Sequence, residues 1–308
     1  MFNLATKKIP QNMDLIGSFK RWKNIILQLK QMDTRLRFIE INLENLFHEK
    51  YLSASDPKLT YRNELRSKEY RVHSQNGEDG LMLYIFSQIG VTNRKFIEFG
   101  IGDGTECIAA NLLLNFGWSG LMIEGSKTYA EHAKKYYGTH PKMQGNLKIL
   151  NKFITKENIN SLFKEGGIEG EIDLLSIDID GNDYWVWKAI DVVSPRVVII
   201  EYNATFGKDK ALTVEYDPSF MRLEKHKSGY YYGLSLKAAE KLGKEKGYRL
   251  IGCDSEGVNA IFVRNDINLG NLKSVTSEEA YYEMKVRTDV CSLSEQYNLI
   301  KHLPIVEV

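Results

Sequence analysis

Cysteine is scarce in this sequence: only Cys107, Cys253 and Cys291 occur among its 308 residues. The three lie far apart, their number is odd and none belongs to a C-x-x-C pair, which argues against a disulfide framework and a zinc site. Such sparse cysteine usage favours a reducing compartment. The sequence also lacks any apolar run of about 18 residues, so we expect no segment to span a membrane.

The sequence also has little net charge, and we expect it to carry no secretory leader. Its formal charge is +1 at pH 7, so no global field would recruit nucleic acid or an anionic membrane. Residues 1–11 contain lysines and a proline but no apolar core of a signal peptide. These absences predict a cytoplasmic protein that binds no nucleic acid. The 43% apolar and 26% charged residues that are present are typical of a soluble globular protein.

Residues 15–46 carry apolar side chains at heptad spacing. A period of 3.5 residues keeps one narrow apolar seam facing a partner helix, as a coiled coil requires. The alternative is an amphipathic helix on the protein's own core, since Ile26, Phe38 and Phe47 widen the stripe. We expect residues 1–52 to be a helical segment that makes the protein a homo-oligomer. The seam residues are Leu15, Trp22, Ile25, Leu29, Met32, Leu36, Ile39, Leu43 and Leu46.

From Tyr70 onward, short apolar runs alternate with helical patterns, which predicts a parallel sheet covered on both faces. The expected strands are residues 95–99, 120–124, 147–150, 172–178 and 196–202. The expected helices are residues 105–116, 127–137 and 156–164, one that begins at 183, and 234–246. Residues 248–253 and 258–263 are joined by a short turn and predict an antiparallel hairpin at the end of the sheet. Residues 53–308 are therefore predicted to form one α/β domain with an insert at 203–232.

The strongest chemical signal is the segment E-F-G-I-G-D-G at residues 98–104, where an apolar strand runs into three alternating glycines. Glycine lets the backbone turn tightly and leaves room for a ligand beside the main chain. The dinucleotide fingerprint G-x-G-x-x-G would need a glycine at Thr105. Glu124 closes the next strand, where an acid can bind ribose hydroxyls. The alternative is a structural turn with an unrelated surface acid at Glu124.

A second group of acids follows the fourth and fifth expected strands. Asp178 and Asp180 point to the same side of an extended segment, and Asp183 follows them. Glu201 and Asn203 end the next strand, so parallel pairing would bring the oxygens together. Crowded carboxylates repel unless a cation or proton intervenes, and Mg²⁺ is a natural guest. The alternative is that Asp183 caps the next helix and Asp180 organises the turn.

The segment Ile177-Asp-Ile-Asp-Gly-Asn-Asp183 resembles the I-D-x-[ED]-G-x-[ED] segment of FkbM-type methyltransferases. With the glycine segment at 98–104 and Glu124 in the same order, the resemblance covers roughly residues 70–263. It implies a Rossmann-like class I methyltransferase sheet. It also implies methyl transfer from S-adenosyl-L-methionine to an oxygen, often on a sugar of a glycan or glycosylated product.

The resemblance also implies roles for individual residues. The acid of the first motif serves the amino-acid end of S-adenosylmethionine, and Asp178 is expected to contact the cofactor and take part in catalysis. Related metal-dependent O-methyltransferases bind Mg²⁺ through an acid and an acid–amide pair, which resemble Asp178, Glu201 and Asn203 in placement; here Tyr202 separates the last two. The expected cofactor-binding residues are Glu98, Gly100, Gly102, Gly104, Glu124 and Asp178. The expected metal ligands are Asp178, Asp180, Glu201 and Asn203.

Two further segments suggest roles near the ligand. The insert at 203–232 is rich in lysine and tyrosine, and tyrosine rings with their hydroxyls suit sugar rings. Within it, His226 is the candidate general base because histidine titrates near working pH; the alternative is an ordinary surface histidine. Residues 74–79, Ser-Gln-Asn-Gly-Glu-Asp, predict a cap for the following helix or a lid over the cofactor.

Taken together, these patterns predict an S-adenosylmethionine-dependent O-methyltransferase that acts on a sugar hydroxyl of a glycan or glycoconjugate with the help of a divalent metal. Two alternatives come from other classes. One is a non-catalytic coiled-coil scaffold that retains cofactor binding. The other is an NAD-dependent sugar oxidoreductase, which the residue at Thr105 and the missing Tyr-x-x-x-Lys pattern argue against.

Overall fold

A computed structural model of the chain describes residues 26, 28, 30, 32, 59–140 and 145–308. The predicted coiled coil at 15–46, the segment 1–52 that contains it and the loop at 53–57 lie outside these residues, except for four helical positions. Apart from those four, the described residues belong to the compact unit Ala54–Val308. Its described helices include none that is long and apolar enough to cross a membrane.

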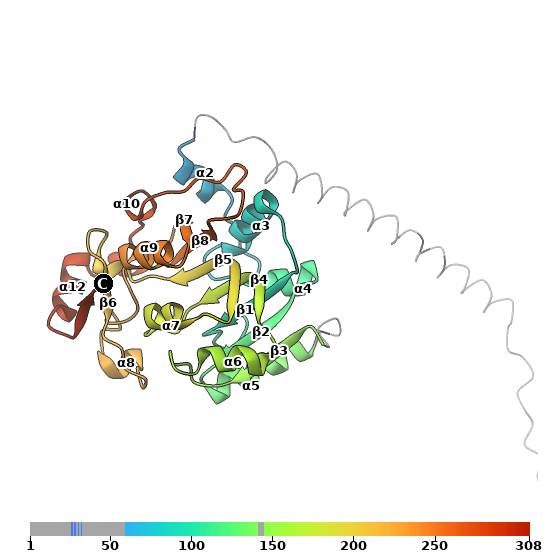
Figure 1. The fold of residues 1–308 in the computed structure, drawn as a ribbon, viewed down its shortest axis with the longest axis horizontal. Coiled ribbons are helices and arrows are strands. Elements are labelled where there is room, and N and C mark those ends of the chain that lie inside the picture. The colour runs from blue at the N-terminus through green and yellow to red at the C-terminus, as the bar shows by residue number, and fades with distance from the viewer. Residues whose placement is uncertain (1–25, 27, 29, 31, 33–58, 141–144) are drawn as a thin grey trace, which may run out of the picture. The chain divides into compact units, whose positions relative to one another are not determined.

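A seven-stranded sheet in the order β3-β2-β1-β4-β5-β8-β7 forms the centre of this unit (Figure 1). The first five strands along the chain pair in parallel, whereas β8 runs antiparallel to both β5 and β7. The predicted α/β fold, with a mostly parallel sheet and an antiparallel hairpin at one end, is therefore confirmed. The strands are β1 (Lys95–Phe99), β2 (Ser119–Glu124), β3 (Leu147–Asn151), β4 (Gly170–Ile177), β5 (Val193–Glu201), β7 (Tyr248–Cys253) and β8 (Asn259–Arg264).

Helices connect and cover these strands. The longer ones are α2 (Tyr61–Ser67), α3 (Glu78–Ile89), α4 (Ala110–Phe116), α5 (Lys127–Gly138), α6 (Ile159–Gly166), α7 (Asp183–Ala189) and α9 (Leu236–Glu245). Ser126 and Ser235 cap α5 and α9 by accepting a backbone N–H from the first turn. Helix α4 begins later than the predicted residue 105, because residues 100–109 form the loop that contains the three glycines, the glycine loop.

The two faces of the sheet have different chemistry. Ile97, Val198 and Ile200 point to one face and belong to an apolar cluster shared with α6, α7 and α9. Successive strand residues alternate between faces, so Glu201 and its cross-strand partner Asn259 point to the other face. There the Asn259 amide donates a 2.7 Å hydrogen bond to Glu78 at the start of α3. The polar ends of the strands therefore lie on the face that α3 covers.

The insert at 203–232 is more ordered than a loop. It contains η3 (Ala204–Phe206), β6 (Leu212–Val214) and α8 (Arg222–Lys225). Strand β6 pairs antiparallel with β9 (Ile305–Glu307), which follows α10 (Ser277–Ala280), α11 (Lys285–Thr288) and α12 (Leu293–Ile300). The sequence reasoning missed both strands, because three residues are too short to show a period of two. The C-terminal strand thus holds the insert in place beside the sheet.

Candidate functional site

The carboxyl ends of β1, β2, β4 and β5 meet at one edge of the sheet. The register pairs Phe99 with both Ile123 and Ile177, and Ile177 with Ile200. The residues that follow these positions are the glycine loop, Glu124, Asp178 and Glu201. Open α/β sheets bind ligands in the crevice outside these strand ends. The predicted site residues of four strands are therefore brought to the same edge.

The three glycines of the loop have different environments, although all have positive φ. A Cβ on Gly100 would lie 1.3 Å from the Asp178 carbonyl oxygen, and one on Gly104 would lie 2.8 Å from the Cβ of Ala133. A Cβ on Gly102 would meet nothing within 4 Å. Gly100 and Gly104 thus allow close packing of the chain itself, whereas Gly102 leaves open space beside its backbone.

Glu124 is linked directly to this loop. Its Oε2 accepts a 2.9 Å hydrogen bond from Gly102 N, and its Oε1 accepts one of 2.7 Å from Ser126 N. Partial burial raises the pKa of this carboxyl, and the backbone N–H donors oppose that shift. A carboxylate at this place has further lone pairs to offer a ligand hydroxyl.

Glu98 has a more enclosed position than sequence reasoning expected. Its two oxygens accept 2.8 and 2.9 Å hydrogen bonds from Ile108 N and Ala109 N, just before α4. Burial raises its pKa to about 7, and the nearby charge of Asp79 contributes to that rise. Glu98 therefore holds the end of the glycine loop that leads into α4. It also lies near the carboxylate of Asp79.

Asp79 closes the segment at residues 74–79. Its Oδ2 accepts hydrogen bonds from the backbone N–H groups of residues 72, 73 and 74 and from Ser74 Oγ, while its Oδ1 has no partner in the part of the chain that the structure describes. Ser74 Oγ in turn accepts the Asp79 N–H at 3.0 Å, so the segment does organise the start of α3. Arg71, which precedes this segment, forms an ion pair of 2.6 Å with Glu106 of the glycine loop.

The second group of acids forms a tight cluster. Oxygens of Asp178, Asp180 and Glu201 all lie within 4.8 Å of one another. Burial and the neighbouring acids raise the pKa of Asp178 and of Glu201 well above the usual range. Glu201 Oε2 is buried and has no hydrogen-bond partner among the described residues. This arrangement suits either shared protons or a bound cation.

Asp183 and Asn203 have structural contacts instead. Asp183 accepts hydrogen bonds from Ile179 N and Gly181 N, while Asn182 is the residue that precedes α7 as its cap. The Asn203 amide donates to the carbonyls of Tyr230 and Tyr232, and its oxygen accepts Thr205 N. Both ends of the buried Asn203 amide thus hold the insert together, so no observed contact supports the prediction that Asn203 is a metal ligand.

Sequence reasoning missed the cations beside this cluster. Arg222 forms an ion pair with Asp180, and its guanidinium carbon lies 3.8 Å from the centre of the Tyr232 ring. Arg287 of α11 lies 4.9 Å from the same ring centre. Nothing in the sequence pattern marks either arginine, because only the folded insert and α11 bring them to the strand ends.

His226 lies in the chain that follows α8. Its Nδ1 is 2.7 Å from Ser228 Oγ, and its ring centre is 6.3 Å from that of His302. Among the described residues, no hydrogen bond or ion pair joins His226 to the carboxylate cluster. The structure therefore gives no contact that supports a role for His226 as the general base.

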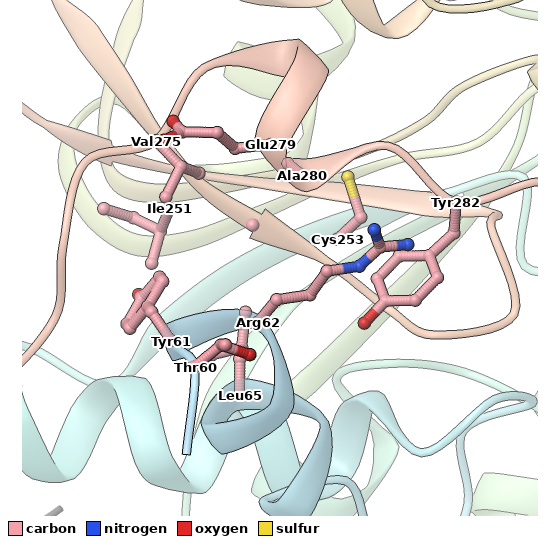
Figure 2. Close-up of a pocket in the computed structure, with 11 residues that line it drawn as sticks. Thr60, Tyr61, Arg62, Leu65, Ile251, Cys253, Val275, Glu279, Ala280 and Tyr282 are labelled. Atoms are coloured by element: carbon pink, nitrogen blue, oxygen red, sulfur yellow. The ribbon is translucent and has the colours of Figure 1, made fainter. Parts of the chain in front are cut away.

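A separate hollow of about 210 Å³ lies between α2 and the end of β7 (Figure 2). Arg62 reaches across it, donates to the Tyr281 carbonyl at 2.8 Å and stacks 3.6 Å from the centre of the Tyr282 ring. The Tyr282 carbonyl accepts a 2.8 Å hydrogen bond from Tyr202, the neighbour of Glu201. The arginine in this hollow is thus already paired.

Comparison with known proteins gives a fold likeness only. No family model and no curated protein matches the chain. A solved structure described as a sarcosine dimethylglycine methyltransferase from Galdieria sulphuraria is 18% identical, with a TM-score of 0.38, and the match covers 56% of this chain and 60% of that one. The N-terminal domain of EvdMO1 with SAH bound is 13% identical, with a TM-score of 0.39 and coverages of 66% and 92%.

A protein from Klebsiella pneumoniae described as an O-methyltransferase is 12% identical, with a TM-score of 0.40 and coverages of 73% and 96%. The matched region thus spans less than two thirds of the Galdieria protein but nearly all of the other two. Because every one of these TM-scores is below 0.5, the function must be argued from the site itself.

Proposed function

We propose that this chain is an S-adenosylmethionine-dependent O-methyltransferase that acts on a sugar hydroxyl of a glycan or glycoconjugate. The observation that carries the proposal is the open space at Gly102 beside Glu124, at the strand ends and next to a buried carboxylate cluster. The glycine loop can hold an adenosyl ligand, and the cluster can hold and deprotonate an acceptor. The resemblance of residues 98–104, 124 and 177–183 to FkbM-type enzymes supports the same interpretation.

The cofactor fits the residues of the loop. The backbone at Gly100, Gly102 and Gly104 would line the ligand, and Glu124 would accept hydrogen bonds from the ribose hydroxyls. The ammonium of the amino-acid end would lie against the unpartnered Asp79 Oδ1 and the neighbouring Glu98. Two buried carboxylates beside each other favour a cation between them, which supports this assignment. Asp178 would face the sulfonium side of the same ligand.

A divalent metal such as Mg²⁺ fits the carboxylate cluster. Asp178, Asp180 and Glu201 offer hard oxygen ligands, and the unpartnered Glu201 Oε2 is free to take one position. When bound, such an ion lowers the pKa of a hydroxyl that contacts it. The ion pair between Arg222 and Asp180 offsets part of the negative charge when the site holds no metal.

The chain's own groups have to orient the acceptor and take its proton. Methyl transfer forms a carbon–oxygen bond, breaks a carbon–sulfur bond and releases the hydroxyl proton. We infer that Glu201 and Asp178, whose oxygens lie in one tight cluster, would take up that proton between them. We propose this pair as the base in place of His226, whose observed contacts lie elsewhere.

Calorimetry tests the proposal directly. We expect S-adenosylmethionine and its demethylated product to bind the wild-type chain with a micromolar Kd, and NAD to give no heat. Gly102→Val should fill the space beside the backbone and Glu124→Ala should remove a hydrogen-bond acceptor, so each should weaken binding about tenfold or more, or by about 1.4 kcal/mol or more. Glu169→Ala, an exposed acid away from the loop, is the matched control. Absence of heat with either adenosyl ligand in the wild type would end the proposal.

A further inference from the structure

Buried polar atoms without partners surround Glu201. Among the described residues these are Glu201 Oε2, the Tyr232 hydroxyl, Arg287 Nη1 and Asn259 Oδ1. Glu201 is 5% exposed and Tyr232 is 1% exposed, so solvent does not readily satisfy either of them. A buried donor or acceptor that lacks a partner destabilises the fold, because it has lost its hydrogen bonds to water. Several such atoms in one place therefore suggest that a bound ligand supplies the missing hydrogen-bond partners.

These atoms converge, although they come from distant parts of the chain. Glu201 and Asn259 are cross-strand partners on one face of the sheet, a relation that sets their Cβ atoms about 5 Å apart. Burial is the main cause that raises the pKa of the Tyr232 hydroxyl; the nearby Glu201 adds to the rise, and Arg287 and Arg222 oppose it. The Arg287 guanidinium lies 4.9 Å from the Tyr232 ring centre.

The two arginines differ in how far they are already paired. Arg222 forms an ion pair with Asp180 and donates a 2.8 Å hydrogen bond to the Gly229 carbonyl. Arg287 stacks on Tyr232 and Tyr230, and its buried Nη1 donates to no group of the described chain. Arg287 is therefore the cation that has a donor to offer a ligand. Guanidinium donors bind carboxylate and phosphate oxygens more strongly than they bind neutral oxygens.

We propose that Arg287 and Tyr232 form the acceptor subsite, and that the acceptor is a hydroxylated ring that carries a carboxylate or phosphate group. The anionic group binds Arg287 Nη1, and ring hydroxyls donate to Glu201 Oε2 and Asn259 Oδ1. The Tyr232 hydroxyl hydrogen-bonds to both the anionic group and a ring hydroxyl of the acceptor, because it both donates and accepts. This inference rests on the proposed function and adds the class of sugar that the site accepts.

The neighbouring acids do not exclude an anion from this place. The oxygens of Asp178, Asp180 and Glu201 gather in one cluster, whereas Arg287 lies against the ring of Tyr232. Asp180 is already paired with Arg222. A divalent ion at the cluster would cancel further negative charge. Once Arg222 is paired with Asp180, the charge of the described residues that remains unpaired beside the Tyr232 ring is the positive charge of Arg287.

Matched sugar probes test the subsite. We expect saturation-transfer NMR, with the demethylated cofactor product present, to show D-glucuronate or D-glucose 6-phosphate binding at least fivefold more tightly than D-glucose. The first probe bears a carboxylate and the second a phosphate, so the two arms also decide between these anions. Arg287→Gln should remove the preference, and Arg287→Lys should retain part of it. Arg62→Gln is the matched control, since Arg62 also stacks on a tyrosine but lies in the separate hollow (Figure 2).

The outcomes separate the subsite from the proposed function. If the demethylated product binds but neither anionic sugar binds better than glucose, the subsite is wrong and the proposed function stands. A preference that survives in Arg287→Gln also overturns the subsite, because another group would then hold the anion. If the demethylated product itself fails to bind, the proposed function falls first. Circular dichroism and the melting temperature of each variant show whether the fold is retained.

Discussion

The Gly102 N–H donates a 2.9 Å hydrogen bond to Glu124 Oε2, and this contact joins the glycine loop to the end of the next strand. It places the open side of Gly102 and an acidic side chain at the same point of the sheet edge. A ligand that enters there meets a bare backbone on one side and a carboxylate on the other. The loop and the carboxylate therefore make separate contributions, which single substitutions can measure.

Alanine should lower stability much more at Gly100 than at Gly102, whereas at Gly102 it should mainly weaken ligand binding. At Gly100 the new Cβ would overlap the Asp178 carbonyl oxygen, so we expect a loss of about 3 kcal/mol or more in the free energy of unfolding. At Gly102 the space is open, and only the φ of 54° opposes alanine, at about 1 kcal/mol.

The measurements for these two variants are urea unfolding and calorimetry with S-adenosylmethionine. Gly102→Ala should raise the Kd about tenfold, because its Cβ occupies the approach of the ligand to the backbone. Binding as tight as that of the wild type in Gly102→Ala would show that the open space is not where the ligand lies.

The buried carboxyl of Glu98 should make stability depend on pH. Burial raises its pKa from 4.5 to about 7, so between these values the folded chain holds a proton that the unfolded chain has lost. Stability contributed by this group therefore falls as pH rises from 4.5 to about 7 and is constant above that range. The shift corresponds to a change on the order of 3 kcal/mol.

Glu98→Gln removes the titrating group and should flatten the plot of unfolding free energy against pH in that window. Glu169→Gln, an exposed acid, is the control and should leave the plot unchanged. The comparison uses slopes, because Gln also exchanges one of the two acceptor oxygens for a donor. An identical slope in Glu98→Gln and the wild type would contradict the pKa that burial assigns to Glu98.

Much of this fold can be predicted from sequence patterns. Strand β1 agrees with the predicted residues 95–99, because an apolar run flanked by a charged residue and a glycine has clear ends. The strands β6 and β9 could not be predicted, because each depends on a partner distant in the sequence and neither is long enough to show alternation. Short elements that depend on distant partners leave no local signal.

Part of the candidate site could also be predicted from the sequence. Glu124 and the carboxylate cluster lie at the strand ends that the sequence indicated, since parallel strands bring their carboxyl ends to one edge. The role of Asn203 could not be decided from the sequence, because an amide at a strand end looks the same whether it binds an ion or holds a loop; here it donates to the loop. Arg287 could not be found, because its approach to Tyr232 depends on how α11 packs.

Mg²⁺ should stabilise the wild type through the carboxylate cluster. A ligand at ten times its Kd raises the free energy of unfolding by about 1.4 kcal/mol, which differential scanning fluorimetry detects as a higher melting temperature. Glu201→Gln should abolish that gain. Without metal the same variant should be about 1 kcal/mol more stable than the wild type, because a buried like charge has been removed.

Asp217→Asn is the control for the Mg²⁺ measurement, because Asp217 is an acid of the insert that is paired with Lys225 away from the cluster. It should respond to Mg²⁺ as the wild type does. If Mg²⁺ leaves the melting temperature of the wild type unchanged, the metal is removed from the proposal. A proton shared by Asp178 and Glu201 is then the remaining way to reduce the repulsion between these acids.

Asp79→Asn tests where the amino-acid end of the cofactor lies. Asparagine keeps the oxygen that accepts the backbone N–H groups of residues 72, 73 and 74, and it replaces only the unpartnered Oδ1 with a donor. We therefore expect S-adenosylmethionine to bind about tenfold more weakly, since a charge-assisted hydrogen bond to its ammonium is lost. Methylthioadenosine lacks the amino-acid end, so its Kd should not change, whereas Glu124→Gln should weaken both ligands. Equal losses for the two ligands in Asp79→Asn would place the ammonium elsewhere and leave the segment at 74–79 as a helix cap alone.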